Sequence, residues 1–289
     1  MTVKNLLNIC DLKIDKLSFS LLDKKNIKRD LRHLLSKLVP CAFNELFLFY
    51  TKIITEKNQN IFNSQFNELI TGKPLAYILK EQSFYKSVFF VDNRVLIPRM
   101  ETELLVETVL KYFSTKKNLF FADFGTGSGC IVISLLKELL NSRAVAIDIS
   151  SQALDVAKYN AEKMSVNSKL DFYNFSVKKF IDSNTSTDLN QTCDFIVANP
   201  PYIGQKSYVQ PFVKIFEPNS ALFADNKGLE FLLSWAKMAL VLLKPNAYYF
   251  FEFGDNQKND LKPKLNLLFS EVSFLKDLQG IYRIAICKK

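Results

Sequence analysis

The sequence predicts an α/β fold in which a doubly wound, mostly parallel seven-stranded sheet follows a small all-helical domain. Two observations carry this prediction. From about residue 98, amphipathic helical segments alternate with short apolar runs, the pattern typical of parallel strands joined by helices. Before about residue 80, helical spacing prevails, with Leu31, Leu34, Leu35 and Leu38 at positions i, i+3, i+4 and i+7.

The expected strands are "LFFADFG", "AVAID", "LDFY", "DFIVAN" and "AYYFFEF", with two more between "SEVSFLKDL" and "YRIAICK". The expected helices are "ETELLVETVLKYF", "CIVISLLKELL", "SQALDVAKYNAEKM" and "GLEFLLSWAKMALVLL". The segment "SVFFVDNRVLI" predicts two short strands around a turn at Asp92–Asn93. We therefore expect a helical domain at 1–80, a β-hairpin linker at 81–97 and an α/β domain at 98–289.

Composition narrows the class of protein. The chain has 38 basic and 29 acidic residues, a net charge of +9. That excess is compatible with an acidic or nucleic-acid partner, but the lysines are spread along the chain, which favours a compositional bias. The five cysteines are scattered and contain no C-x-x-C pair, which indicates free thiols in a reducing compartment and no metal site. The N-terminus resembles no signal peptide, and no apolar run is long enough for a membrane span. We expect a cytoplasmic protein.

The stretch "FADFGTGSGC" is the first candidate site. Gly125, Gly127 and Gly129 stand between a strand and a helix, where backbone amides can approach a ligand closely. Cys130 occupies the position at which a dinucleotide-binding loop needs a third glycine or alanine, which argues against NAD and FAD. The Lys-Ser/Thr pair of an ATP-binding loop is missing as well.

Two acids accompany the loop. Asp148 ends the next strand, where its carboxylate can accept both hydroxyls of a ribose. Asp123 lies just before the glycines, where a carboxylate can meet a cationic amino group. A nucleoside with an amino-acid tail and no pyrophosphate is S-adenosylmethionine, the cofactor that this pattern predicts.

The second site is "FIVANPPYIG". Asn199 ends the fourth strand, on the same sheet edge as the glycine loop. Pro200 and Pro201 restrict the backbone, so that the Asn199 side-chain oxygen and the Pro200 carbonyl can accept two hydrogen bonds from one planar NH2 group. Tyr202 offers a flat wall for that group. The pattern suits methylation of a weakly nucleophilic, conjugated nitrogen by positioning and electrostatics alone.

Together the two motifs resemble class I S-adenosylmethionine-dependent methyltransferases that modify planar NH2 groups, either of adenine or guanine in nucleic acid or of glutamine in protein. Other segments resemble, in order and spacing, the bacterial peptide chain release factor glutamine methyltransferases. They are "TGKPLAYIL" (71–79), "LIPRMETELLVE" (96–107), "FEPNSAL" (216–222), "KGLEF" (227–231) and "DLQGIYRI" (277–284). The similarity runs from about residue 70 to the end.

The resemblance implies a function. A methyl group would pass from S-adenosylmethionine to the amide nitrogen (N5) of the glutamine in the Gly-Gly-Gln motif of release factors. The N-terminal helices would hold the release factor, and no nucleic-acid target, no membrane and a monomeric state are expected. The alternative is an amino methyltransferase acting on adenine or guanine in DNA or RNA, although no basic, aromatic-interleaved recognition unit is visible.

The resemblance also implies the site residues. The cofactor would contact Gly125, Thr126, Gly127, Ser128, Gly129, Asp148, Ser176 and Asn199, and the catalytic segment would be Asn199, Pro200, Pro201 and Tyr202. Two positions depart from the family pattern. Met100 replaces a second proline, and Asn174-Phe175-Ser176 stands where an aromatic residue contacts the adenine, so either Phe175 or Ser176 is expected to do so.

Overall fold

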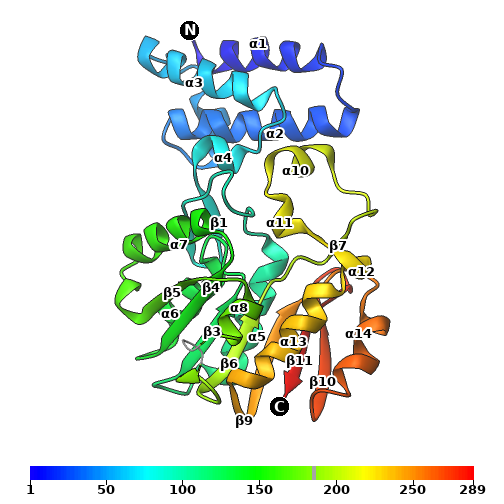
Figure 1. The fold of residues 1–289 in the computed structure, drawn as a ribbon. Helices are drawn as coiled ribbons and strands as arrows, with labels where there is room; N and C mark the ends of the chain where they lie inside the picture. Colours follow the sequence, from blue (N-terminus) through cyan, green and yellow to red (C-terminus); the bar gives the residue numbers. More distant parts are fainter. Residues whose placement is uncertain (184–186) are drawn as a thin grey trace. The chain divides into compact units, whose positions relative to one another are not determined.

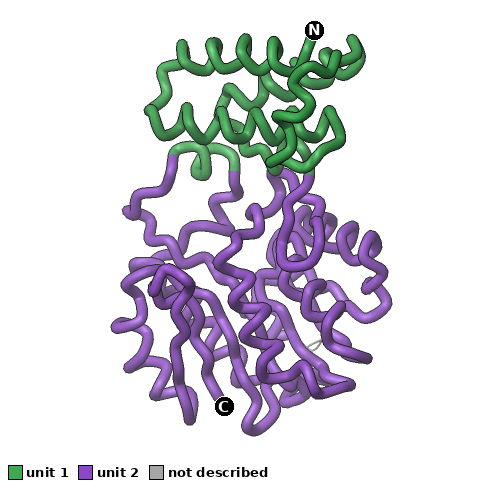
Figure 2. The backbone as a smooth tube through the Cα atoms, turned by 180° about the vertical axis from the view of Figure 1, so that it is seen from behind, with its two compact units in different colours: residues 1–80, 211–216 green, residues 81–210, 217–289 purple. Residues whose placement is uncertain are grey.

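The computed structural model describes residues 1–183 and 187–289 (Figure 1). The chain divides into two compact units, one of residues 1–80 and 211–216 and one of residues 81–210 and 217–289 (Figure 2). The sequence did not predict that residues 211–216 would join the helical unit. The Phe212 ring explains this membership, because it meets the Phe19 ring edge-on at 5.2 Å and fills the space beside Gly72.

The helical unit contains α-helices and one 3-10 helix, and a side chain caps the N-terminus of three of them. They are α1 (Val3–Asp15), α2 (Leu21–Leu38), the 3-10 helix η1 (Phe43–Phe49), α3 (Glu56–Leu69), α4 (Leu75–Leu79) and α10 (Pro211–Phe216). Ser20 caps α2 by accepting a hydrogen bond from the Asp23 amide. Of the predicted leucine stripe, Leu31, Leu34 and Leu35 are fully buried in this unit's own core. The predicted N-terminal helical domain is confirmed.

The other unit contains a seven-stranded sheet with the strand order β10-β11-β9-β6-β3-β4-β5. The strands are β3 (Phe120–Phe124), β4 (Arg143–Asp148), β5 (Leu170–Asn174), β6 (Cys193–Ala198), β9 (Leu243–Glu252), β10 (Glu271–Lys276) and β11 (Tyr282–Lys288). Neighbours from β5 to β9 pair in parallel, whereas β11 is antiparallel to both β9 and β10. The predicted doubly wound, mostly parallel sheet is therefore confirmed.

Helices cover both faces of this sheet (Figure 1). On one face lie α5 (Met100–Phe113), α6 (Cys130–Glu138) and α7 (Ser151–Lys163), and on the other α8 (Val177–Ile181), α13 (Glu230–Leu242) and α14 (Lys258–Leu265). Side chains alternate along β6, so that Phe195 and Val197 enter the first core while Ile196 and Ala198 enter the second. Strand order reverses between β3 and β6, and in sheets of this type ligands bind at the carboxyl ends of strands beside such a reversal.

Shorter elements complete the unit: β1 (Gln82–Phe84), β2 (Ser87–Phe89), η2 (Asn167–Lys169), β7 (Ile203–Gly204), α11 (Asn219–Leu222), β8 (Phe223–Ala224) and α12 (Asp225–Gly228). The predicted hairpin comes earlier than expected, because β1 and β2 pair around Tyr85–Lys86. Asp92 does form a turn, in which its carbonyl accepts from the Val95 amide, but residues 93–99 after this turn form no strand. No helix in the described part of the chain is long and apolar enough to cross a membrane.

Candidate active site

The glycine loop leaves β3 and starts α6 with all three glycines at positive φ: 70° at Gly125, 55° at Gly127 and 79° at Gly129. A Cβ on Gly125 would lie 2.7 Å from the Trp235 ring, and one on Gly129 would lie 2.8 Å from Ile133. At Gly127 the nearest heavy atom is 4.0 Å away, so this residue has an open side. A ligand can therefore approach the loop backbone at Gly127.

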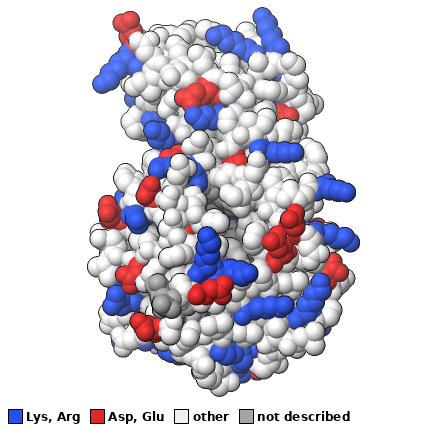
Figure 3. Space-filling view, in the orientation of Figure 1, with Lys and Arg blue, Asp and Glu red and all other residues white. Residues whose placement is uncertain are grey.

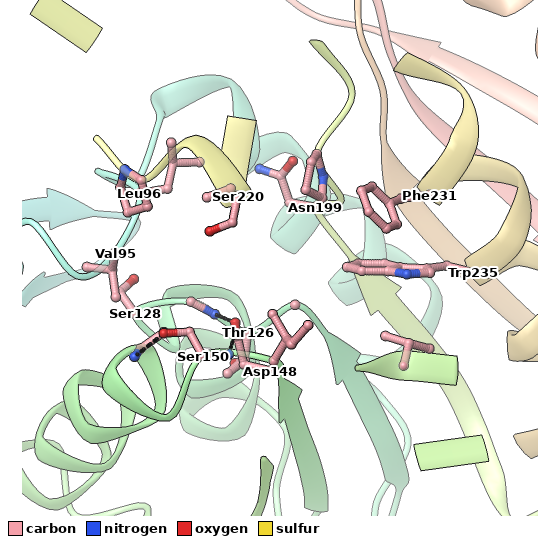
Figure 4. A pocket seen from close by; sticks show the side chains of 18 of the residues that line it. Val95, Leu96, Thr126, Ser128, Asp148, Ser150, Asn199, Ser220, Phe231 and Trp235 are labelled. Atoms are coloured by element: carbon pink, nitrogen blue, oxygen red, sulfur yellow. Dashed lines mark hydrogen bonds between the residues drawn. The ribbon is translucent and has the colours of Figure 1, made fainter. Parts of the chain in front are cut away.

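Asp148 is fixed by two backbone amides at the end of β4. Its Oδ2 accepts from the Gly127 N–H and its Oδ1 from the Ser150 N–H, each at 2.9 Å (Figure 4). Burial raises the pKa of Asp148, and the hydrogen bonds from Ser150 and Gly127 oppose that rise. Each oxygen retains a lone pair, so a carboxylate of fixed orientation lies beside the open side of the loop.

Asp123 contradicts the expectation placed on it. Its side chain is fully buried and accepts a hydrogen bond of 2.7 Å from the Thr126 hydroxyl. Burial raises its pKa to about 7. Asp123 therefore holds the glycine loop through Thr126 and is not part of the cavity lining.

A cavity of about 510 Å³ opens above the loop and is lined wholly by residues of the α/β unit. Of the sequence-predicted cofactor residues, those in its lining are Gly125, Thr126, Gly127, Ser128, Asp148, Ser176 and Asn199. Gly129 lies outside the lining. Of the predicted catalytic segment, Asn199 and Pro201 are in the lining, whereas Pro200 and Tyr202 are not. The volume of the cavity suits a drug-sized or cofactor-sized ligand.

The loop after β5 brings both candidate adenine contacts to the cavity. The Ser176 hydroxyl accepts a hydrogen bond from the Lys179 amide and so caps α8. The Phe175 ring is 36% exposed and packs at 6.4 Å from the Phe180 ring. Because the Ser176 hydroxyl already serves as a cap, Phe175 is the better source of a stacking surface.

Helix α13 forms a wall that sequence reasoning missed. Phe231, Ser234, Trp235 and Met238 recur at helical spacing and line the cavity. Figure 4 shows Phe231 and Trp235 beside Asn199, while Asp148 lies across the cavity from them. The same spacing also describes a helix packed on a sheet, so the sequence signal alone indicated only core packing.

The segments 96–107 and 216–222, which were singled out in the sequence, meet at the edge of the cavity. Glu217, almost completely buried, accepts from the Arg99 guanidinium at 2.5 Å and from the Ile97 amide at 3.1 Å. This pairing joins "LIPRMETELLVE" to "FEPNSAL". It fixes the entry to α5 although Met100 replaces a proline there.

Hydrogen bonds from neighbouring elements hold Asn199 and Tyr202 in place. The Asn199 Nδ2 donates to the Thr102 hydroxyl at 3.1 Å, and the Tyr202 hydroxyl donates to Glu252 at 2.9 Å. Gln257 donates to the Tyr202 carbonyl at 2.9 Å. The segment from Asn199 to Tyr202 is therefore anchored to α5, to the end of β9 and to the loop after it.

Comparisons with known proteins agree with this geometry. A model of the family "Methyltransferase small domain" matches residues 100–226. The chain is 32% identical over 250 residues to a release factor glutamine methyltransferase of Chlorobaculum tepidum, and the match covers 84% of each protein. The chain belongs to the release factor glutamine methyltransferase family. The resemblance predicted from the sequence motifs is thus confirmed, and the chain is a methyltransferase.

Two further proteins are informative about the length and the fold of this methyltransferase. A bifunctional methyltransferase of Rickettsia prowazekii is 32% identical over 305 residues, which is 98% of this chain but 56% of that protein. The chain therefore spans little more than half the length of that relative. The METTL16 methyltransferase domain shares the fold at 19% identity, with a TM-score of 0.52, covering 70% of this chain and 87% of that one.

Proposed function

We propose that this methyltransferase transfers a methyl group from S-adenosylmethionine to the N5 amide nitrogen of the glutamine in the Gly-Gly-Gln motif of peptide chain release factors. The observation that carries the proposal is the hydrogen bonding of Asn199, which commits the Nδ2 to Thr102 and leaves the Oδ1 for a substrate NH2 group. The printed name of the Chlorobaculum relative supports the substrate class.

The residues of the cavity fit the cofactor. The open side of Gly127 allows its backbone to approach the ligand, Asp148 has lone pairs for the ribose hydroxyls, and Phe175 offers a ring for the adenine. S-adenosylmethionine supplies a methyl group on a sulfonium centre. Apolar and aromatic side chains of α13 line the opposite side of the cavity.

The chemistry assigned to Asn199 and Pro200 is positioning. An amide nitrogen shares its lone pair with the carbonyl and is therefore a weak nucleophile. Two acceptors, the Asn199 Oδ1 and the Pro200 carbonyl oxygen, would hold both hydrogens of the substrate NH2 and direct its lone pair at the methyl group. The nitrogen becomes acidic once it is methylated, and its proton can then leave to water without a dedicated base.

We propose that the helical unit holds the release factor. Residues 1–80 contain 13 basic and 7 acidic side chains, so two thirds of the net charge of +9 lies in little more than a quarter of the chain. Several large apolar side chains are also exposed there, among them Leu12, Leu21 and Phe47. Positive charge beside exposed apolar groups favours an acidic protein surface as the partner.

Two observations disfavour a nucleic-acid substrate. The remaining 209 residues carry 25 basic and 22 acidic side chains, nearly a balance. Figure 3 shows Lys and Arg interspersed with Asp and Glu on the face drawn, not gathered into a continuous track. We propose the cytoplasm as the compartment, since all five cysteines are free thiols, and a monomer as the working state.

A side-by-side assay tests the proposed function. Purified protein and cofactor labelled in the methyl group are incubated with a release factor and, separately, with DNA and with RNA. We expect label in the release factor. Label in nucleic acid with none in the release factor would overturn the proposal in favour of an adenine or guanine methyltransferase.

Trp235 predicts a direct binding signal. It is the only tryptophan of the chain, and it lines the cavity against Gly125. We expect its fluorescence to change saturably as S-adenosylmethionine or S-adenosylhomocysteine is added. Trp235→Phe should abolish the signal while calorimetry still detects binding. A saturable calorimetric signal without any fluorescence change would place the ligand elsewhere.

A further inference from the structure

A buried chain of hydrogen bonds runs from Glu252 to Asn199. The Thr102 hydroxyl donates to the Glu252 Oε2 at 2.6 Å and accepts from the Asn199 Nδ2 at 3.1 Å. Thr102 is 2% exposed and Glu252 is 1% exposed. We infer that Thr102 and Glu252 are positioning residues that fix the direction of the Asn199 amide, so that its oxygen and not its NH2 group faces the substrate. This inference rests on the proposed function of Asn199.

The direction follows from the number of hydrogens available. A hydroxyl has one hydrogen to donate, and a carboxylate can only accept. Because Thr102 gives its hydrogen to Glu252, its oxygen is left as an acceptor, and only the NH2 side of Asn199 can satisfy it. A reversed amide would turn its NH2 group toward the NH2 of the substrate, donor against donor.

Glu252 also has a second donor. The Tyr202 hydroxyl donates to its Oε1 at 2.9 Å, so one hydroxyl occupies each carboxylate oxygen. Burial raises the pKa of Glu252, and the bonds from Thr102 and Tyr202 and the charge of Arg283 oppose that rise. Because both hydroxyls donate to Glu252, they favour its carboxylate form, which can only accept. Glu252 therefore holds both ends of the Asn199–Tyr202 segment: Tyr202 directly and Asn199 through Thr102.

The anchor lies on regular structure, whereas Asn199 lies in a loop. Thr102 is in the first turns of α5, and Glu252 is the last residue of β9. A buried carboxylate is costly, and apolar groups of similar volume would fill the same space at lower cost. Packing alone therefore does not account for a glutamate and a threonine here, whereas fixing the direction of an amide does.

Substitutions in α5 test this inference. Thr102→Val keeps the shape and removes the hydroxyl, and we expect kcat to fall about 10- to 100-fold. The affinity for the cofactor, measured through Trp235, should stay unchanged. Thr102→Ser restores the hydroxyl and should recover most of the activity. Thr108→Val is the matched control: this buried threonine of the same helix donates to the Leu104 carbonyl, and the variant should keep wild-type kcat.

A double variant separates positioning from general damage. If Thr102 acts through Asn199, Thr102→Val should lower kcat no further in an Asn199→Ala background. Wild-type kcat in Thr102→Val, or the same fold-loss in both backgrounds, would overturn the inference. Thr102→Val also removes a donor from the buried Glu252 carboxylate, so its melting temperature should fall below that of Thr108→Val. The comparison of kcat in the two backgrounds therefore decides between positioning and general damage.

A measurement without substrate keeps this test independent of the proposed function. The side-chain NH2 resonances of Asn199 in ¹⁵N-labelled protein are assigned by their loss in Asn199→Ala. They should shift in Thr102→Val and stay in place in Thr102→Ser. Unchanged resonances in Thr102→Val would contradict the inference even if the release factor is methylated. If the wild type fails to methylate a release factor while these resonances behave as expected, the proposed function fails and the orientation of the amide stands.

Discussion

Asn199→Ala is expected to lower the rate of methyl transfer about 10²- to 10³-fold, the loss typical for removal of one preorganised hydrogen-bonding group that stabilises a transition state. The variant removes one of the two acceptors proposed for the substrate NH2 group. Cofactor affinity should change much less, because Asp148 and the glycine loop remain in place. Single-turnover rates and cofactor titrations on the same preparations measure the two effects separately.

Asn199→Asp is the matched variant. It keeps an oxygen directed at the substrate but loses the donor to Thr102, whose hydrogen is already directed at Glu252. We therefore expect a rate between those of the wild type and of Asn199→Ala. Full activity of Asn199→Ala would show that the two prolines serve only to end β6.

Asp148→Ala is expected to weaken cofactor binding by roughly 1.5–3 kcal/mol, or about 10- to 150-fold in Kd, the range for hydrogen bonds to a charged group. The change removes the proposed acceptor of the ribose hydroxyls and releases the amides of Gly127 and Ser150. Isothermal titration calorimetry with S-adenosylhomocysteine measures the loss.

Two variants control for charge and shape. Asp148→Asn keeps one oxygen but turns an NH2 group toward a backbone N–H, so its Kd should lie between those of the wild type and the alanine variant. Asp171→Ala removes a half-exposed carboxylate of neighbouring β5, 3.6 Å from Arg143, and should leave the Kd unchanged. Unchanged affinity in a folded Asp148→Ala would reject the ribose assignment.

Hydrophobic periodicity and the positions of strand ends predicted most of the elements that position the site. The alternation of helices and apolar runs is a local signal, and it specified the seven strands before any contact was known. Gly127, Asp148 and Asn199 were predicted to share one edge because the carboxyl ends of parallel strands meet there, and all three line one cavity.

Other features depend on contacts that no local pattern encodes. Thr102 and Glu252 are separated by 150 positions, and only the folded sheet brings them together. The six residues 211–216 join the helical unit because Phe212 packs against Phe19. No pattern in the sequence of this segment predicts that contact. Asp123 was assigned to the cofactor from its position before the glycines, but its side chain faces the buried side of the loop.

The position of the transferred methyl group tests the central claim most directly. Wild-type protein is incubated with cofactor and an intact release factor, and in parallel with a release factor whose Gly-Gly-Gln glutamine is changed to alanine. Peptide mass spectrometry then locates the methyl group. We expect one added methyl on the side-chain nitrogen of that glutamine and none in the alanine control. Equal methylation of both proteins, or a methyl group at another residue, would contradict it.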